Sequence, residues 1–230
     1  MKYGNIIVVG GSSGIGLEYA RFIEPQCEEL ITISRRPSPN GKWIKTDITN
    51  PEDITSLVEQ IGQRPIDGLL YLGGTWETHA FTDAYTFESC KDRDLENVLA
   101  VNLLGPIRLI QAILPNLKKA VNPRIVVTGA AIAGLSLGGG KEVANTASML
   151  GLRGMVLGLR HTLNTLKIGI TLLKPGYVAT PEVLQEFKES DISDDHAIPL
   201  SDLFIIIESI FRLSHRTNIN EIEIPTMLLG

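Results

Sequence analysis

An apolar run that ends in a glycine-rich turn stands almost at the start of the chain, at Ile6-Ile7-Val8-Val9-Gly10-Gly11-Ser12-Ser13-Gly14-Ile15-Gly16. Its β-branched residues show no polar alternation, which predicts a strand buried on both faces. After the turn, apolar residues recur on one face of a predicted helix, at Ile15, Tyr19, Phe22 and Ile23. A strand, a glycine turn and a helix in this order favour a nucleotide-binding turn, because free N–H groups at the helix start attract phosphate.

Each glycine of this turn has a different expected task. Gly10 allows the tight turn, Gly14 lets the backbone approach a pyrophosphate, and Gly16 lets the helix pack against the strand. Ser12 and Ser13 add hydroxyl donors, and we expect them to cap the helix. Glycine is common in turns of every kind, so a turn without any ligand stays an open alternative.

The composition limits the class of protein. A chain of 230 residues with 43% apolar residues can bury one sizeable core, so we expect a single domain over residues 1–230. The net charge is −5 and the Lys and Arg residues form no basic stripe, which argues against nucleic-acid binding. Cys27 and Cys90 lack metal-ligand spacing and suit reduced thiols. With no room for a signal peptide and no apolar run near ~18 residues, we expect a cytoplasmic protein without a metal site or a membrane segment.

Predicted strands and helices alternate along the whole chain. Strands are predicted at residues 6–9, 30–34, 43–46, 68–72, 124–128, 168–173 and 221–224, the last of them edge-type. Helices are predicted after the first turn, from Asn50, over residues 95–117 and 145–166, and from a cap at Ser201. Residues 75–94 read as a loop over the site, and residues 182–195 are acidic with little periodicity. This order predicts an α/β fold with a Rossmann-like, doubly wound, mostly parallel sheet and helices on both faces.

The end of the second predicted strand bears on the choice of cofactor. Ser34 is followed by Arg35 and Arg36, where a dinucleotide fold carries an acid for a ribose diol or an arginine for a 2′-phosphate. Two arginines before a proline are also compatible with a plain solvated loop. The pattern favours NADP(H) over NAD(H).

These residues together resemble the classical short-chain dehydrogenase/reductase family, over almost the whole chain. The resemblance implies that Asp47 and Ile48 meet the adenine, that Asn102 holds a proton-relay water, and that Thr180 contacts the nicotinamide carboxamide. Gly73 and Gly74 end the fourth strand as in the family. The full set of cofactor contacts implied is Gly10, Ser12, Ser13, Gly14, Ile15, Gly16, Arg35, Arg36, Asp47, Ile48, Gly73, Gly74, Pro175, Gly176, Val178 and Thr180.

Two strand residues depart from the family at the same place. Tyr71 and Leu72 replace the two asparagines that the family has before the glycines. Tyr71 ends a buried strand, so we expect a core aromatic whose hydroxyl has a partner.

The residues that carry the family's chemistry are also replaced. Ala131 stands where the family has a serine that orients the substrate. Counting back from Pro175-Gly176 aligns the family's Tyr-x-x-x-Lys pair with Asn145 and Met149, whereas a rival register anchored on Gly151-Leu152 gives Glu142 and Thr146. Neither register supplies a tyrosine or a lysine.

This loss removes the usual acid of carbonyl reduction. A tyrosine with a reference pKa of ~10 works near neutrality only beside positive charge, and Asn145 cannot ionise while Met149 supplies no charge. Positioned proton transfer is typically worth 10²–10⁴ in rate, about 3–5 kcal/mol. We therefore expect ordinary carbonyl reduction to be abolished or residual. The candidate catalytic positions that remain are Asn102, Asn145 and Tyr177.

Three functions stay open at this point. The first is an NADP(H)-binding protein with a binding, sensing or non-redox role, and the second is an oxidoreductase, isomerase, lyase or cyclase with relocated catalytic residues. The third is a structural scaffold without cofactor. The small-molecule ligand has no motif. The helix Met149–Leu159 is apolar nearly all round, which with the family resemblance predicts a homo-oligomer, a dimer or tetramer, built on this helix and the one around Asn102.

Overall fold

The computed structural model describes residues 2–130 and 140–227, so Ala131 lies outside the described residues. One sheet runs through it in the order β3-β2-β1-β4-β5-β6-β7, and every neighbouring pair is parallel. The strands are β1 (Tyr3–Val9), β2 (Cys27–Ser34), β3 (Lys42–Lys45), β4 (Gly68–Tyr71), β5 (Arg124–Thr128), β6 (Gly169–Pro175) and β7 (Glu221–Ile224). The predicted doubly wound sheet is confirmed, with β7 at an edge as predicted.

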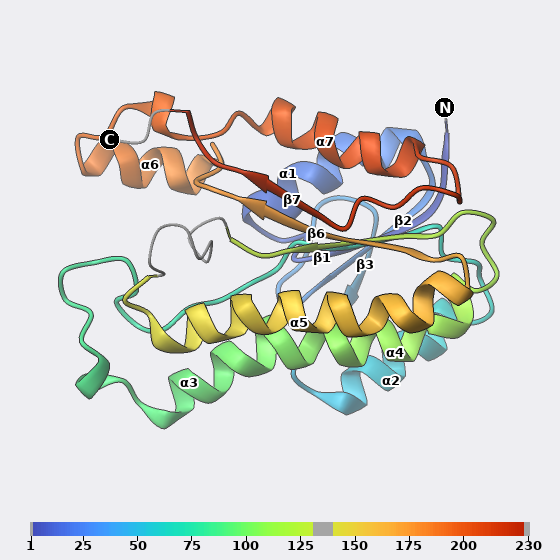
Figure 1. The fold of residues 1–230 in the computed structure, drawn as a ribbon, viewed down its shortest axis with the longest axis horizontal. Helices are drawn as coiled ribbons and strands as arrows, with labels where there is room; N and C mark the ends of the chain where they lie inside the picture. Colours follow the sequence, from blue (N-terminus) through green and yellow to red (C-terminus); the bar gives the residue numbers. More distant parts are fainter. Residues whose placement is uncertain (1, 131–139, 228–230) are drawn as a thin grey trace.

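Helices cover both faces of the sheet (Figure 1). Alternate residues of β1 serve the two faces: Ile6 and Val8 belong to the core under α1 and α7, and Ile7 and Val9 to the core under α2, α4 and α5. The helices are α1 (Gly14–Ile23), α2 (Pro51–Ile61), α3 (Asp92–Leu99), α4 (Gly105–Leu117), α5 (Val143–Thr165), α6 (Pro181–Glu189) and α7 (Leu200–Arg212). Because both faces are covered, ligands can reach the sheet only at its ends.

Helix starts test the predicted caps. At α2 the prediction is confirmed, since Asn50 accepts a hydrogen bond from the N–H of Glu52 at 2.9 Å. At α7 the predicted Ser201 cap is wrong: the helix begins at Leu200, and the Ser201 hydroxyl donates to Asp202 instead. Side-chain capping competes with such local contacts between neighbours.

Two predicted segments differ from the structure. Residues 182–195, expected to lack periodicity, begin with α6, whose N-cap Thr180 accepts from the N–H of Val183. Val183, Leu184 and Phe187 form a short apolar stripe on α6, of which only Phe187 is buried, and the acidic residues around it obscure it in the sequence. The predicted helix 95–117 begins earlier, at Asp92, and contains a π-helical segment, Ala100–Leu104, between α3 and α4.

The run Asp92–Leu117 is, by length and composition alone, apolar enough to cross a membrane, with a mean hydropathy of 1.6 in its best window. We expected no such run. Its α4 part supplies Leu109, Ile110 and Ile113 to the core against the sheet. A core helix with a buried face passes the same hydropathy test, so this run is weak evidence for a membrane segment.

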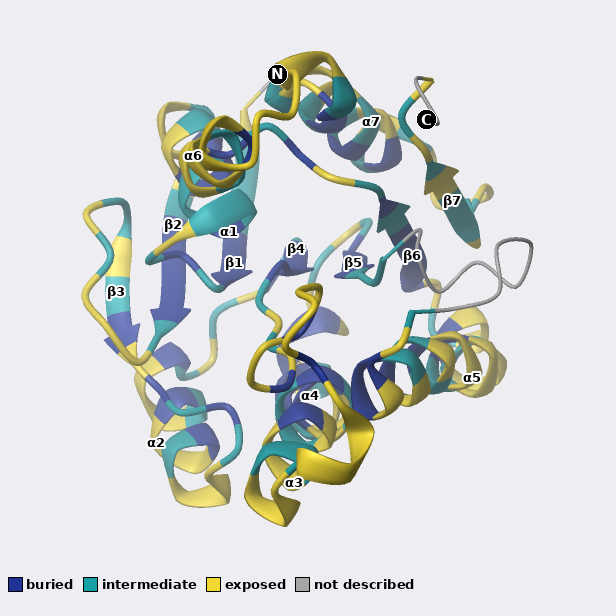
Figure 2. Cartoon of the chain, turned by 90° about the vertical axis from the view of Figure 1, so that its left-hand side faces the viewer, coloured by how far each residue is buried: buried dark blue, intermediate teal, exposed yellow. Residues whose placement is uncertain are grey.

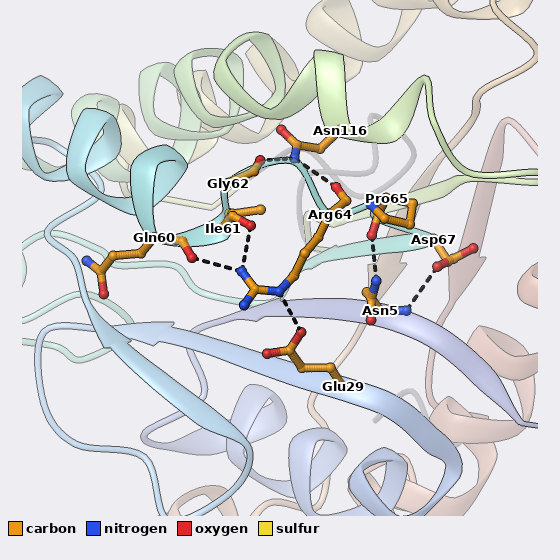
Figure 3. A network of polar contacts seen from close by, with 9 residues as sticks. All are labelled: Asn5, Glu29, Gln60, Ile61, Gly62, Arg64, Pro65, Asp67 and Asn116. Atoms are coloured by element: carbon orange, nitrogen blue, oxygen red, sulfur yellow. Dashed lines mark hydrogen bonds and ion pairs between the residues drawn. The ribbon is translucent and has the colours of Figure 1, made fainter.

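A polar network fixes the end of the sheet at which β4 begins (Figure 3). Arg64 donates to the carbonyls of Gln60 and Ile61 at the end of α2 and pairs with Glu29 of β2 at 3.1 Å. Asn116 of α4 donates to the carbonyl of Arg64 at 2.8 Å. The connection from α2 to β4 is thereby tied to β2 and α4. The other end of the sheet, where the strands finish, is left open.

Candidate functional site

The glycine turn lies where the strand order reverses, between the carboxyl ends of β1 and β4. Figure 2 shows the sheet from this side. In Figure 1 the same side is on the left, and β6 and β7 point toward it. Gly10 has a φ of +88°, and a Cβ on it would lie 2.9 Å from the Cα of Gly73. A Cβ on Gly16 would lie 2.4 Å from the Gly10 carbonyl oxygen. Only glycine fits at these two positions, and the crossover point is where doubly wound folds bind ligands.

The space beside Gly14 is open, and the Gly14 N–H donates a hydrogen bond to a carboxylate. Its φ is +56°, and a Cβ on it would meet nothing within 4 Å. The Gly14 N–H donates to Oε1 of Glu182 on α6 at 3.2 Å. A carboxylate therefore stands at the helix start where a phosphate is expected, and the local geometry suits an anion.

The two serines of the turn do not cap α1. Ser13 is the N-cap residue, but its hydroxyl makes no capping hydrogen bond, which corrects our expectation. It accepts instead from Nη2 of Arg36 at 3.4 Å. Ser12 is half-buried in the turn, and Ile15 packs against the core under α1 and α7. Arg36 therefore lies beside the turn.

Arg35 takes a different direction from Arg36. It is exposed, and its charge acts on Asp47, whose Oδ1 accepts from the N–H and the hydroxyl of Thr49 at 2.9 and 2.7 Å. Burial alone would raise the pKa of Asp47, but the Thr49 hydrogen bonds and the charge of Arg35 hold it below its ordinary value. Asp47 therefore stays ionised and fixed, while neighbouring Ile48 is buried in the core.

The asparagine of the long helix lies in the π-helical segment. The Tyr71 hydroxyl donates to the carbonyl of Val101 in that segment at 2.6 Å, as expected for a core tyrosine with a partner. Asn102 accepts from the N–H of Thr75 at 2.9 Å and donates to the Thr75 carbonyl at 2.7 Å and to the Ser148 hydroxyl at 3.1 Å. Asn102 thus joins the loop after β4, in which Gly74 is exposed, to α5. Such segments recur at functional sites.

Two buried carboxylates tie the loop after β4 to the first turn of α5. Glu77, 1% exposed, accepts from the N–H groups of Ala144 at 2.7 Å and Asn145 at 3.2 Å through Oε1. Its Oε2 is buried and has no hydrogen-bond partner among residues 2–130 and 140–227. Glu142 accepts from the N–H of Phe81 at 2.8 Å. Glu77 could not be identified from the sequence, because a single glutamate in a polar loop has no pattern that indicates burial.

The start of α5 holds both pairs of residues that the two registers proposed. Asn145 is buried, and its carbonyl accepts from the Ser148 hydroxyl at 2.7 Å, so Asn102, Ser148 and Asn145 form one chain of contacts. Met149 lies against the end of β5, with its sulfur 3.8 Å from a Cβ built on Gly129. In the rival register, Glu142 serves the loop. None of the four side chains in the two registers is a phenol or an ammonium group, whereas the Tyr85 hydroxyl accepts from the N–H of Val143 at the same helix start at 3.2 Å.

An ammonium group does lie at this end of the sheet, on Lys174 of β6. Its Nζ is 2.6 Å from Glu221 and 2.7 Å from Glu223 of β7. Burial alone would lower the pKa of Lys174, but the two carboxylates raise it above its ordinary value. Its positive charge is therefore neutralised within the sheet.

The loop after β6 leads into α6. Gly176 follows Pro175 and donates to the carbonyl of Ile224 at 2.8 Å, which ties the loop to β7. Val178 and Thr180 are buried, and Tyr177 is 45% exposed with its ring 5.3 Å from that of Phe187. Tyr177 thus packs on α6, whereas Asn102 and Asn145 share contacts through Ser148.

Acidic, histidine and cysteine side chains do not gather for a metal anywhere in residues 2–130 and 140–227: no group of three or more could hold an ion.

Comparisons with known proteins give a consistent picture. Residues 4–191 match the family model for short chain dehydrogenases. The chain is 29% identical over 188 residues to the short chain dehydrogenase adrF of Penicillium roqueforti, covering 76% of this chain and 70% of that protein. It is 30% identical over 186 residues to the short-chain dehydrogenase/reductase cdmF of Talaromyces verruculosus, with 76% and 70% covered. A putative short chain dehydrogenase of Escherichia coli CFT073, solved in complex with NADPH, shares the fold with a TM-score of 0.80 at 20% identity over 97% of each chain.

Proposed function

Because the chain belongs to the short chain dehydrogenase family, whose members bind nicotinamide cofactors, we propose that it binds NADP(H) but does not carry out ordinary carbonyl reduction. The observation that carries this proposal is the start of α5. Asn145 lies there under Glu77 and Met149 lies against Gly129, so these two positions supply neither the phenol nor the ammonium group of the family's chemistry. The role that we propose for the protein is then binding, sensing or non-redox chemistry.

The turn and its surroundings support the cofactor part of the proposal. Gly14 offers an N–H and open space to the pyrophosphate, and the family resemblance assigns Asp47 to the adenine and Thr180 to the nicotinamide end. Arg36 lies beside the turn, and Arg35 is exposed at the same strand end, so both can meet a 2′-phosphate. Ser34 offers no acid to a ribose diol, and its hydroxyl already donates to the carbonyl of Arg36.

The residues at α5 explain the expected loss of reduction. A bound nicotinamide supplies a hydride to a neighbouring carbonyl. The alkoxide that develops needs a proton, and Asn145 can donate a hydrogen bond but cannot give up a proton near neutrality. Met149 cannot grip a ribose hydroxyl, and Ala131 cannot orient a carbonyl.

Calorimetric titration tests cofactor choice. We expect wild type to bind NADPH more tightly than NADH, and Arg36→Ala to lose about 10-fold in affinity for NADPH with little change for NADH, since a charge-assisted contact contributes about 1.5–3 kcal/mol. Arg35→Ala should give a similar selective loss. Arg21→Ala, an exposed arginine on α1 paired only with Glu18, is the matched control. Equal affinity of wild type for both cofactors would contradict the NADP(H) assignment.

A turnover assay tests the chemical part. Wild type should not oxidise NADPH with a panel of aldehydes, ketones and quinones, and the triple variant Ala131→Ser, Asn145→Tyr, Met149→Lys should gain measurable turnover. Robust wild-type turnover would favour the second candidate, an enzyme with relocated residues. Tyr177 is the specific observation for that candidate, because its phenol is exposed on the loop after β6. Tyr177→Phe would then remove the acid while leaving the ring on Phe187.

We also propose that a second copy of the chain covers the outer face of α5. Val143, Leu150 and Leu157 are exposed along this helix, and Leu104 and Ile107 are exposed near the start of α4. A row of exposed leucines favours burial against an equivalent surface. Light scattering at micromolar concentration should give an oligomer for wild type and a monomer for Leu157→Asp. A monomeric wild type would contradict this proposal.

A further inference from the structure

The carboxylate of Glu182 takes the position on the turn that the proposed cofactor needs. The Gly14 N–H donates to Glu182 Oε1 at 3.2 Å, across 168 residues of sequence. A pyrophosphate bound at the start of α1 requires the same N–H group. The two anions cannot share it, because each would lie within hydrogen-bonding distance of the same donor and repel the other.

The surroundings of Glu182 favour its charged form. Burial alone would raise its pKa, but its own N–H and that of Gly14, the hydroxyl of Thr180 and the charge of Arg36 hold the pKa below its ordinary value. Arg36 also donates to the Ser13 hydroxyl at 3.4 Å, so the arginine contacts the turn while its charge acts on the carboxylate. Glu182 thus makes the kind of contacts that a bound phosphate would make.

The helix that carries Glu182 is lightly attached to the rest of the molecule. Phe187 is the one buried residue of α6, and its ring packs on exposed Tyr177. A hollow of about 480 Å³ lies between α6 and the turn that follows it, lined by residues such as Leu184 and Ile192. Few buried apolar contacts mean a low cost of local movement.

Backbone hydrogen bonds hold the two ends of the segment from Thr180 to Ala197 together. Val178 and Ile198 form a parallel bridge, in which the N–H of Ala179 donates to Ile198 at 2.8 Å and the N–H of Ile198 donates to Tyr177 at 2.7 Å. A compact segment whose two ends are held together can shift as a unit while the strand before it stays in place.

We propose that Glu182 is an internal competitor for the phosphate position, so that α6 must move off the turn before NADP(H) binds. This inference rests on the proposed function and adds a regulatory contact to the same site. A protein in which only a fraction of molecules is free to bind shows a weaker apparent affinity by that fraction. Whatever draws α6 away from the turn, such as a ligand in the hollow beneath it, would raise cofactor affinity.

The test is calorimetric titration of NADPH at fixed ionic strength into wild type, Glu182→Gln and Glu186→Gln. Both changes remove one exposed negative charge from α6, but only Glu182 touches the turn. We expect Glu182→Gln to bind NADPH about fivefold more tightly than wild type, and Glu186→Gln to match wild type. Unchanged affinity in Glu182→Gln overturns the inference, and so does an equal gain in both variants, which would indicate a general charge effect.

A second probe separates this inference from the proposed function. If wild type and both variants fail to bind NADPH, the proposed function is wrong. Inorganic pyrophosphate, titrated into wild type and Glu182→Gln, still decides the role of Glu182, since it needs only the turn. Tighter binding to the variant supports the competition, and equal or undetectable binding to both rejects it.

Discussion

The two sides of the site are built by different means. On the side of the turn, the geometry comes from backbone: Gly10 against Gly73, and Gly16 against the Gly10 carbonyl. On the side of α5, the geometry comes from side chains that meet across long stretches of sequence, Asn102 with Thr75 and Glu77 with Ala144. Contacts between backbone atoms do not depend on which side chains surround them, whereas a side-chain network depends on every partner. In the proposed function, the first side binds the cofactor through the turn, and the second side has lost the residues of the family's chemistry.

The largest effect should come from filling the turn. In Gly16→Ala, the new Cβ would lie 2.4 Å from a backbone oxygen, so the strand or the helix must shift. We expect a loss of about 3 kcal/mol in unfolding free energy, measured by urea denaturation, and no measurable NADPH binding. Gly14→Ala is the control: its Cβ has open space, and only the positive φ is strained, at about 1 kcal/mol. Similar losses in both variants would show that close packing does not define the turn.

Removing the asparagine should test the opposite side. Asn102→Ala deprives both backbone groups of Thr75 of their partner and removes the hydrogen bond that the Ser148 hydroxyl accepts. Part-buried groups left unsatisfied should cost about 2 kcal/mol in the same denaturation experiment. Ser148→Ala, which removes only one of these contacts to Asn102, should cost about half as much. A loss no larger for Asn102→Ala than for Ser148→Ala would show that the loop does not depend on the asparagine.

The charge on Glu77 should have a smaller effect. Glu77→Gln keeps an oxygen that can accept from the N–H of Ala144, but it removes negative charge from the start of a long helix. We expect about 1 kcal/mol of destabilisation and faster hydrogen exchange at Ala144 and Asn145. Glu88→Gln, in the exposed part of the same loop, should change neither quantity. Unaltered exchange in Glu77→Gln would mean that shape, and not charge, holds the loop on α5.

The smallest effect should be the pH dependence of the β6–β7 contact. Hydrogen bonding to Lys174, together with the charge of Arg153, lowers the pKa of Glu221 from its ordinary 4.5. The resulting stability is fully present above that ordinary value and is lost as pH falls through the lowered folded-state pKa. Lys174→Met should therefore flatten the fall in stability between about pH 5 and pH 3 by less than 1 kcal/mol, because the carboxylates are partly exposed. Lys188→Met on α6 should leave the slope unchanged, and an equal slope in Lys174→Met would contradict the pairing.

The same contrast explains what could be predicted from sequence. The strands and the turn are local patterns, so β4, β5 and the Gly10–Gly16 turn were found where the structure has them. The fold class followed from their order. The α6 helix was missed, because its apolar stripe consists of only Val183, Leu184 and Phe187 in an acidic segment.

The α5 side of the site was predictable only in part. Asn102 was identified as a polar residue that needs a partner, but its partners, Thr75 and Ser148, lie 27 and 46 residues away. Glu77 had no signal at all, since its burial depends on where α5 begins. A capping hydrogen bond is predicted for Ser13, but its hydroxyl accepts from Arg36 instead. This contact depends on how the ends of two strands approach each other.

The π-helical segment Ala100–Leu104 sets the phase between α3 and α4. An α-helix advances by about 100° per residue, so deleting a single residue there, and letting regular hydrogen bonding close, would turn α3 by roughly that angle about the axis of α4. The loop bound to Asn102 would be turned away from α5 with it. Most surface loops tolerate changes in length. Here the deletion of one residue would rotate α3 and break these contacts without changing any of the side chains that make them.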